Sequence, residues 1–366
     1  MRIKKITPIC VHMPFEHGGK KAKLNGQDWD KLEFVLVKVE MDNGIIGWGE
    51  SFGYVSWKPV KVAIEEFLAP YIVGRNINTA NDIHDLVLEI QKTFHIFGRY
   101  GISIYALSGI EIGLWDALGK DKNLPIYSLI DGGSKKEFKA YASLFRYSDT
   151  KIIEKKCKEA LDRGFNIIKL HEIKNNCIEA ARQFVGQDTP LMIDVNCAWS
   201  IDEIINNKNF LKKINLLWIE EPIFPPEDFK KLAFLKNELN ISIAAGENAC
   251  THWEFEKMID ENAVNFTQPS VIKVGGISEM SKIIKYSERK NIPVMPHTAY
   301  FGPGFLASLH LASSTKLEVF IERFWLNLKE EFYPDFKTTI NGKYLLPSGP
   351  GLGLEFNEKI ISKYSV

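Results

Sequence analysis

The sequence has no excess of charge of either sign and no long uninterrupted apolar run. Lysine plus arginine and aspartate plus glutamate each number 46, so the formal net charge is zero. Without a basic excess, nothing in the composition points to a nucleic acid or an anionic membrane as partner. The first residues lack the apolar core of a signal peptide, and no run reaches the roughly 20 apolar residues that span a bilayer. We therefore expect a cytoplasmic protein that binds neither nucleic acid nor membrane.

Cysteine is scarce and forms no motif. The five cysteines are odd in number, scattered along the chain and free of any CxxC pair. This pattern argues against a disulfide framework and against a cysteine-based zinc site. We expect reduced thiols, most of them packed in the core.

The hydrophobic pattern divides the 366 residues into parts. Residues 1–126 begin with period-two alternation, which predicts antiparallel strands joined by a hairpin at Asp42–Gly44, and continue with helices. Residues 127–333 alternate short apolar runs with amphipathic helices, which predicts an α/β protein with a closed parallel barrel. Residues 334–366 return to short-strand character, and we expect them to fold back onto the N-terminal part.

Three acidic residues end three successive apolar runs at nearly equal spacing. Asp194 closes PLMIDVN, Glu220 closes NLLWIEEP and Glu247 closes SIAAGEN, at intervals of 26 and 27 residues. One βα unit of such a barrel takes roughly 25–30 residues, so the three carboxylates would meet at the carboxyl ends of adjacent strands. Any one of them alone could simply start a loop or cap a helix. Three at this spacing predict a metal site, and oxygen-only ligands suit Mg²⁺.

Most other predicted barrel strands also end in a group that can bind a ligand or move a proton. Lys169 and His171 are two residues apart in one strand, so both side chains face the same way. The remaining groups of this kind are Ser143, Asn196, Ser270, His297 and Glu322. Together these residues predict an active site at the barrel mouth.

With these motifs the chain resembles the enolase superfamily, specifically the mandelate racemase branch of acid-sugar dehydratases and racemases. The resemblance spans essentially the whole length and rests on ALSGIEIGLWDALGK, IKLH, IDVN, WIEEP, GEN, KVGGI, PHTAYFGPGF and IER. It implies a modified (β/α)7β TIM barrel with an α+β capping domain formed from both termini. It also implies one Mg²⁺ per site and removal of the proton α to a substrate carboxylate, giving an enediolate. We further expect a homo-oligomer.

The resemblance implies roles for the residues of the second strand. The family usually carries Lys-x-Lys there, whereas this chain has Lys169-Leu170-His171. Lys169 would assist the substrate carboxylate and His171 would act as the base. We expect the charge of Lys169 to lower the pKa of His171, and the alternative for His171 is a hydrogen-bonded structural side chain.

The resemblance also places His297 as an acid or base on strand seven, with one departure. Its usual aspartate partner belongs to a QPD motif, and this chain has Gln-Pro-Ser, so Ser270 could offer only a weaker hydrogen bond. Glu322 would donate to the second carboxylate oxygen if it is protonated. A salt bridge from Glu322 to Lys273 or Arg323 is the structural alternative.

Two loops of the capping part are expected to select the substrate. Residues 14–29 are rich in glycine and lysine, which predicts a mobile lid, and residues 49–57 form the second loop. Any residue of these loops could instead be a solvated side chain. The expected substrate contacts are His17, Trp29, Tyr54, Ser143, Asn196 and Ser270.

Three functions remain open at this point. The favoured one is a lyase that removes water from an aldonate or aldarate to give a 2-keto-3-deoxy acid. The second is a racemase or epimerase with His171 and His297 on opposite faces of the α-carbon, which the missing aspartate disfavours. The third is an inactive protein that binds a metal or a sugar acid, which the intact set of site residues disfavours.

Overall fold

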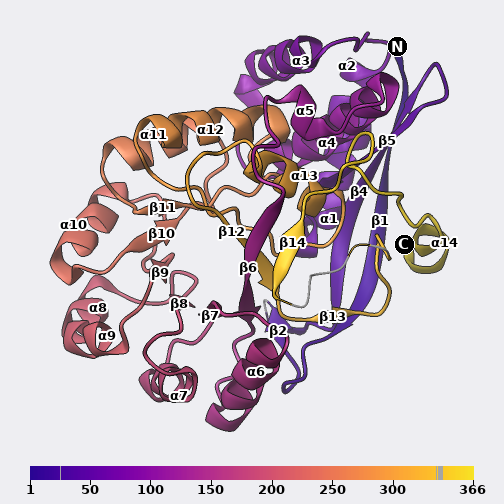
Figure 1. The fold of residues 1–366 in the computed structure, drawn as a ribbon. Coiled ribbons are helices and arrows are strands. Elements are labelled where there is room, and N and C mark those ends of the chain that lie inside the picture. The colour runs from indigo at the N-terminus through magenta and orange to yellow at the C-terminus, as the bar shows by residue number, and fades with distance from the viewer. Residues whose placement is uncertain (25, 335, 337–340) are drawn as a thin grey trace.

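The computed structural model describes residues 1–366 except 25, 335 and 337–340. Its elements form a capping region with an antiparallel sheet and a barrel region of parallel strands wrapped by helices (Figure 1). No helix among the described residues is long and apolar enough to cross a membrane.

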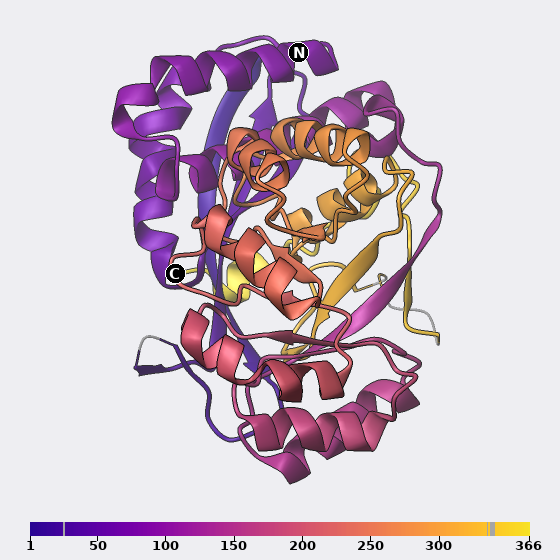
Figure 2. The same ribbon diagram turned by 90° about the vertical axis from the view of Figure 1, so that its left-hand side faces the viewer.

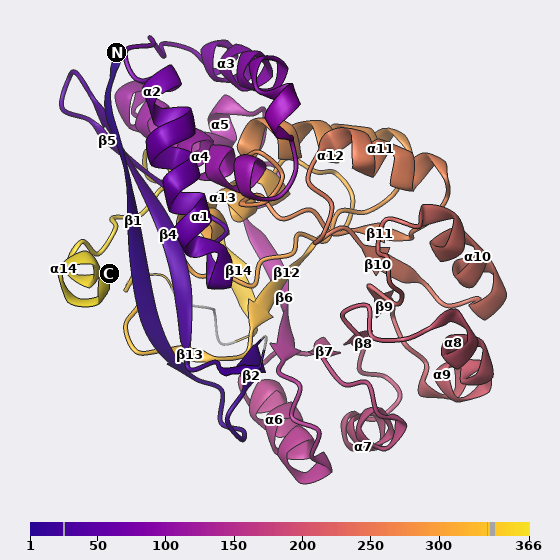
Figure 3. The ribbon, with the colours of Figure 1, turned by 180° about the vertical axis from the view of Figure 1, so that it is seen from behind.

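The capping sheet has the strand order β13–β1–β4–β5. As predicted, β4 and β5 form a hairpin that turns at Asp42–Gly44. Seen from behind, the long strands β1 and β4 stand at one side with α1, α2 and α4 against them, and α3 packs on α4 (Figure 3). The strands of this region are β1 Ile3–Glu16, β4 Lys31–Met41, β5 Ile46–Ser51 and β13 Asn327–Leu328, with a small hairpin of β2 Lys23–Leu24 and β3 Gln27–Asp28. The helices are α1 Trp57–Val62, a π-helical turn Ala63–Leu68, α2 Ala69–Ile72, α3 Ala80–Thr93, α4 Ile102–Lys122 and α5 Ile126–Leu129.

Helix α4 touches the backbone of β5 directly. A Cβ added at Gly49 would stand only 1.9 Å from the carbonyl oxygen of Gly109 in α4. Because no side chain fits there, glycine is required on both surfaces, which explains the small residues in ALSGIEIGLWDALGK and GWGES.

The barrel strands pair in the order β11–β10–β9–β8–β7–β6–β12, and every pair in this path is parallel. The predicted fold class, a modified barrel with a capping domain, is confirmed. Residues 292–297, expected to be a strand, form only an isolated parallel bridge between Val294 and Thr267. The strands are β6 Glu137–Leu144, β7 Ile168–Leu170, β8 Leu191–Asp194, β9 Ile219–Glu220, β10 Ile243–Ala245, β11 Phe266–Thr267 and β12 Phe320–Phe324.

Helices cover the outside of these strands (Figure 2), and most of them are amphipathic, whereas every residue of α13 is buried. They are α6 Thr150–Asp162, α7 Asn175–Val185, α8 Ile201–Asn206, α9 Lys208–Ile214, α10 Phe229–Leu239, α11 His252–Asp260, α12 Ile277–Arg289 and α13 Pro303–Ala312. The predicted capping box of α8 is confirmed, because Ser200 and the side chain of Glu203 exchange hydrogen bonds.

Strand periodicity stacks two layers of side chains inside the barrel. An apolar floor is built from Tyr141, Ile167, Met192, Trp218, Ala244, Met295 and Phe320, with Phe266 packed against it. Two residues further along each strand comes a polar layer, made of Ser143, Lys169, Asp194, Glu220, Gly246, Gln268, His297 and Glu322. The apolar side chains of the floor thus fill the barrel beneath the polar residues.

The C-terminal segment contacts both regions. Strand β14, Lys343–Leu345, pairs antiparallel with β6 of the barrel. Helix α14, Lys359–Tyr364, lies beside β1, and the N–H of Val366 donates to the carbonyl of Cys10 over 3.1 Å. The exact domain boundaries at 126 and 333 stay a prediction.

Two buried carboxyls of the capping region bind the first turns of two barrel helices. Glu111 of α4 accepts hydrogen bonds from the backbone N–H of Ile277 (2.6 Å) and of Ser278 (2.8 Å) in α12. Glu50 of β5 accepts one from the N–H of Gly304 (2.9 Å) in α13. Burial raises the pKa of Glu111 to about 7 and that of Glu50 to about 8. These contacts tie the capping region to the barrel.

Candidate active site

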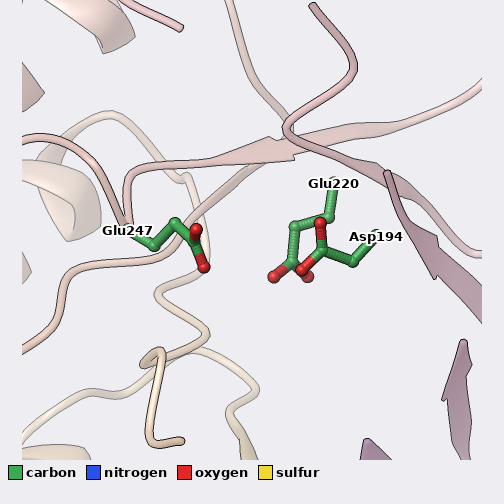
Figure 4. A group of neighbouring side chains, drawn as sticks. All are labelled: Asp194, Glu220 and Glu247. Atoms are coloured by element: carbon green, nitrogen blue, oxygen red, sulfur yellow. The ribbon is translucent and has the colours of Figure 1, made fainter. Parts of the chain in front are cut away.

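The three predicted metal ligands come together at the mouth of the barrel. Asp194 ends β8, Glu220 ends β9 and Glu247 follows β10. Their carboxylates point into a common space (Figure 4), and one oxygen from each lies within 4.8 Å of the others.

Glu247 reaches this space by a different route from the other two acids. Asp194 and Glu220 enter the polar layer by strand alternation, but in β10 the corresponding position is Gly246. Gly246 has φ +135°, a conformation that favours glycine, and it turns the next side chain inward. A Cβ at Gly246 would also stand 2.6 Å from the ring of Phe255. The spacing of 26 and 27 residues thus conceals an offset of one residue that the glycine corrects.

Lys169 lies at the centre of the acidic groups. Its Nζ is 2.6 Å from Glu220 Oε1, 2.9 Å from Glu322 Oε1 and 3.8 Å from Asp194 Oδ2, and the side chain is fully buried. Burial alone would lower the pKa of Lys169, but Glu220 and Glu322 outweigh it and hold the pKa well above its usual value. Lys169 is therefore a permanent positive charge within the site.

The three crowded carboxylates suit a divalent cation. Burial and the neighbouring carboxylates raise the pKa of Glu220 to about 7. Lys169 opposes this rise but does not cancel it. Oδ2 of Asp194 is buried, with Lys169 Nζ 3.8 Å away. Carboxylate oxygens are the ligands that Mg²⁺ prefers, so the crowded side chains of Asp194, Glu220 and Glu247 could hold it.

His171 is oriented from both sides of its ring. Nδ1 lies 2.6 Å from the carbonyl oxygen of Leu144, so Nδ1 carries the proton of the neutral ring, and Nε2 lies 3.2 Å from Asp194 Oδ2. Burial and Lys169 lower the pKa of His171, but Asp194 outweighs them and the pKa is raised. Lys169 does lower the pKa of His171 as expected, but the net shift is upward because Asp194 has the larger effect.

His297 pairs with Glu247 and not with the residue after Gln-Pro. Its Nε2 lies 3.0 Å from Glu247 Oε2. Burial alone would lower the pKa of His297 and raise that of Glu247, but the pair raises the first and lowers the second to about 2. Nδ1 of His297 is buried with no hydrogen-bond partner among the described residues, and Ser270 Oγ instead donates to Tyr300 over 3.5 Å. The expected bond between Ser270 and the ring is therefore absent.

Glu322 is ionised and paired with Lys169. Burial alone would raise its pKa, but Lys169 and His297 lower it to about 2. The N–H of Thr298 donates to its Oε2 over 3.1 Å. The alternative partners are wrong: Arg323 donates to backbone carbonyls, and Lys273 lies over the ring of Phe52 at 4.9 Å.

Comparison with known proteins decides the family. The family model described as "Enolase C-terminal domain-like" matches residues 153–360, and the model "Mandelate racemase / muconate lactonizing enzyme, N-terminal domain" matches residues 22–131. The chain belongs to the mandelate racemase/muconate lactonizing enzyme branch of the enolase superfamily. It is 32% identical to an arabinonate dehydratase of Saccharolobus solfataricus over 346 residues, which cover 91% of each chain.

Two solved structures show the same superfamily fold. The 3,6-anhydro-D-galactonate cycloisomerase of Zobellia galactanivorans is 26% identical with a TM-score of 0.85, covering all of both chains. An enolase from Bradyrhizobium, complexed with magnesium and mandelic acid, is 26% identical with a TM-score of 0.84, covering 100% of this chain and 98% of that one. The resemblance to the enolase superfamily read from the motifs is confirmed.

The expected substrate contacts of this superfamily member form an aromatic wall beside the mouth. His17 stacks on Phe145 with ring centroids 4.4 Å apart, and Trp29 meets Tyr54 edge to face at 5.7 Å. The hydroxyl of Tyr54 donates to the carbonyl of Ala299 over 2.8 Å. His17 Nδ1 and Trp29 Nε1 are buried without hydrogen-bond partners among the described residues.

The lysines of the predicted lid are engaged elsewhere. Lys20 pairs with Asp149 at 3.6 Å and Lys21 with Asp28 at 3.3 Å, and both lysines are largely exposed. The positive charge that the composition of residues 14–29 suggested for substrate binding is therefore not directed at the site.

Two further expected contacts have different surroundings. Ser143 is buried, and its Oγ has no hydrogen-bond partner in the part of the chain that the structure describes. Asn196 is exposed at the rim, where its Oδ1 accepts a hydrogen bond from Arg146 over 2.9 Å. Arg146 also donates to the carbonyl of His171 over 2.5 Å. Sequence reasoning missed Arg146, although a cation two residues after the end of β6 was a usable signal.

Sequence reasoning also missed two side chains that donate hydrogen bonds to Glu220. Gln268 Nε2 donates to Glu220 Oε2 over 2.6 Å, and Trp218 Nε1 donates to the same oxygen over 3.1 Å. The position of Trp218, two residues before Glu220 on the same strand face, was the signal.

Proposed function

We propose that this chain is a Mg²⁺-dependent dehydratase of a sugar acid, an aldonate or an aldarate. The observation that carries the proposal is the position of two imidazoles at opposite ends of the carboxylate cluster. His171 Nε2 lies beside Asp194, and His297 Nε2 lies beside Glu247. A proton acceptor and a proton donor at separate ends of one site suit an elimination, which needs both. The similarity to an arabinonate dehydratase supports the same reaction class.

The chemistry demands positive charge at the substrate carboxylate. A proton α to a carboxylate is weakly acidic, because its removal adds a second negative charge. Mg²⁺ held by Asp194, Glu220 and Glu247 would supply Lewis-acid stabilisation of that charge. Lys169 adds a fixed positive charge in a water-poor setting, where electrostatic interactions are strong.

The two histidines would complete the elimination. His171 takes the α-proton on Nε2, because its Nδ1 proton is held by the carbonyl of Leu144. The bond between the β-carbon and its hydroxyl then breaks, and the hydroxyl leaves as water with a proton from His297. The resulting enol then tautomerises: it releases the proton of its α-hydroxyl to solvent, takes up a proton at the β-carbon and becomes the 2-keto-3-deoxy acid. One water is lost, and no oxidant or reductant is needed.

The polar atoms near the mouth favour a substrate with several hydroxyls. His17 Nδ1, Trp29 Nε1 and Ser143 Oγ are buried without partners in the described parts of the chain. A buried polar atom without a partner destabilises the protein, whereas a polyhydroxy chain supplies both donors and acceptors. The aromatic rings of the wall can pack against the C–H faces of the same chain.

A racemase or epimerase is the second candidate function. The observation in its favour is that Glu247 orients the ring of His297 without the missing aspartate. Two oriented imidazoles could exchange a proton across the α-carbon.

A substrate screen separates these functions. The protein would be incubated with a library of aldonates and aldarates, with Mg²⁺ or with EDTA, in D₂O. We expect Mg²⁺-dependent formation of 2-keto-3-deoxy acids. Exchange of the α-hydrogen in both epimers without loss of water would establish the racemase, and binding without either reaction would leave a non-catalytic binding protein. As a matched control, His95→Asn removes an exposed histidine and should leave turnover unchanged.

A further inference from the structure

Glu220 differs from the other two acids in how its carboxylate is held. Its Oε1 faces Lys169, and its Oε2 accepts two side-chain N–H donors, from Gln268 and Trp218. Asp194 instead accepts the backbone N–H of Asn196 on Oδ1 and has His171 Nε2 at 3.2 Å from Oδ2, and Glu247 pairs with His297.

We propose that Gln268 and Trp218 form a clamp that fixes the orientation of the Glu220 carboxylate, and that this clamp sets the affinity for Mg²⁺. The inference rests on the proposed function, because it assumes that the three carboxylates hold Mg²⁺. Both are positioning residues, since they act through Glu220 and neither belongs to the set of metal ligands.

The local structure explains how two distant residues reach one oxygen. Trp218 precedes Glu220 by two residues, so it lies directly beneath it on the same face of β9. Gln268 follows β11, and β10 lies between β11 and β9. The two interior positions of β10 are Ala244 and Gly246, whose small size leaves the path across β10 open to the Gln268 amide.

The composition of the clamp is hard to explain by packing alone. Gln268 is fully buried, and its Oε1 has no hydrogen-bond partner among the described residues, so the amide carries an unmatched acceptor. An apolar side chain of similar size would avoid that unmatched group. Trp218 lies in the apolar floor, where a phenylalanine could fill most of the space without an N–H. Both residues therefore contribute N–H groups to a carboxylate at some cost to packing or hydrogen bonding.

The expected size of the effect follows from other metal sites. Loss of one hydrogen-bond partner that orients a metal ligand typically weakens metal binding by about 10–100-fold. Removal of either clamp N–H should have an effect in this range. Because both donors act on one oxygen, their effects should not multiply, and the double variant should lose less than the product of the two single losses.

The experiment measures binding of Mg²⁺ and Mn²⁺ to the full chain by calorimetry, without substrate. Gln268→Met keeps the length of the side chain and removes the amide, and Trp218→Phe removes the indole N–H. Gln91→Met is the matched control, because Gln91 of α3 is also a buried glutamine whose amide atoms lack partners. We expect a 10–100-fold loss of affinity in the first two variants and no change in the control.

A second measurement separates a positioning role from a merely structural one. In an activity assay, the Mg²⁺ concentration for half-maximal rate should rise in Gln268→Met, while the rate at saturating Mg²⁺ returns to within a few-fold of the unmodified protein. If Gln268→Met does not fold, Trp218→Phe alone decides the question. Wild-type affinity for the metal in folded variants would overturn the clamp and leave the proposed function standing. Failure of the unmodified protein to bind Mg²⁺ would instead remove the proposed function.

Discussion

Replacement of Glu111 tests whether one buried carboxyl holds the capping region on the barrel. Glu111 is fully buried on α4, 166 residues from its first partner in α12. Its two oxygens accept hydrogen bonds from the N–H of Ile277, the N–H of Ser278 and Nε1 of Trp115, the last over 2.7 Å. In Glu111→Ala all three donors would lose this acceptor.

The magnitude follows from those three donors. A buried donor left without its partner costs about 1–3 kcal/mol, and hydrogen bonds to a charged acceptor contribute most. Because burial raises the pKa of Glu111 to about 7, its carboxyl is only partly ionised at neutral pH, which favours the lower part of that range. Trp115 Nε1 also lies 3.3 Å from Ser278 Oγ, which can replace its bond. We therefore expect Glu111→Ala to lower the free energy of unfolding by about 3–5 kcal/mol, a large share of the about 5–15 kcal/mol that is typical of folded proteins.

Urea denaturation followed by far-ultraviolet circular dichroism would measure this loss. Glu203→Ala is the control, because Glu203 is an exposed carboxylate that caps only its own helix α8 and should cost about 1 kcal/mol. Glu111→Gln keeps the shape and one acceptor and should fall between the two. A loss in Glu111→Ala no larger than that of Glu203→Ala would refute the reasoning that this carboxyl joins the two regions.

The remaining predictions concern the site and the response to pH. Neutral replacement of any candidate metal ligand should abolish turnover and weaken Mg²⁺ binding while the fold is retained. The variants are Asp194→Asn, Glu220→Gln and Glu247→Gln. Full activity of metal-free protein would contradict the metal site. In His171→Asn, substrate in D₂O should show no exchange of its α-hydrogen by NMR, and exchange that persists here but stops in His297→Asn would reverse the two roles. His310 is buried, which lowers its pKa from 6.5 to about 4, although its bond to the carbonyl of Leu352 opposes the shift. The unfolded chain then binds the proton first as the pH falls, so up to about 3 kcal/mol of stability should be lost between pH 6.5 and pH 4. Denaturation of His310→Gln at pH 7 and pH 4.5 should lack that part of the loss, and equal losses in both proteins would contradict it.

The sequence was sufficient for the architecture and for the meeting of the three acidic side chains, because both depend on spacing along the chain. Period-two alternation predicted the antiparallel strands of residues 1–126. In residues 127–333, helices between short apolar runs predicted parallel strands. Asp194, Glu220 and Glu247 could be chosen because each follows its own apolar run, and parallel strands bring such ends to one edge. The apolar pattern of residues 292–297 predicted a full strand, but only Val294 forms a bridge there.

Only the tertiary structure decided which side chains of the site pair with one another. Lys169 pairs with Glu220 and Glu322, His297 pairs with Glu247, and Gln268 crosses a neighbouring strand to reach Glu220. A periodic pattern states which face a side chain occupies, but it contains no distance between two strands and no sum of the charges that meet there. The pKa of His171 illustrates the difference, because it depends on the balance between Lys169, which lowers it, and Asp194, which raises it. Only the closed barrel sets the distances that decide this balance and the partner of each carboxylate.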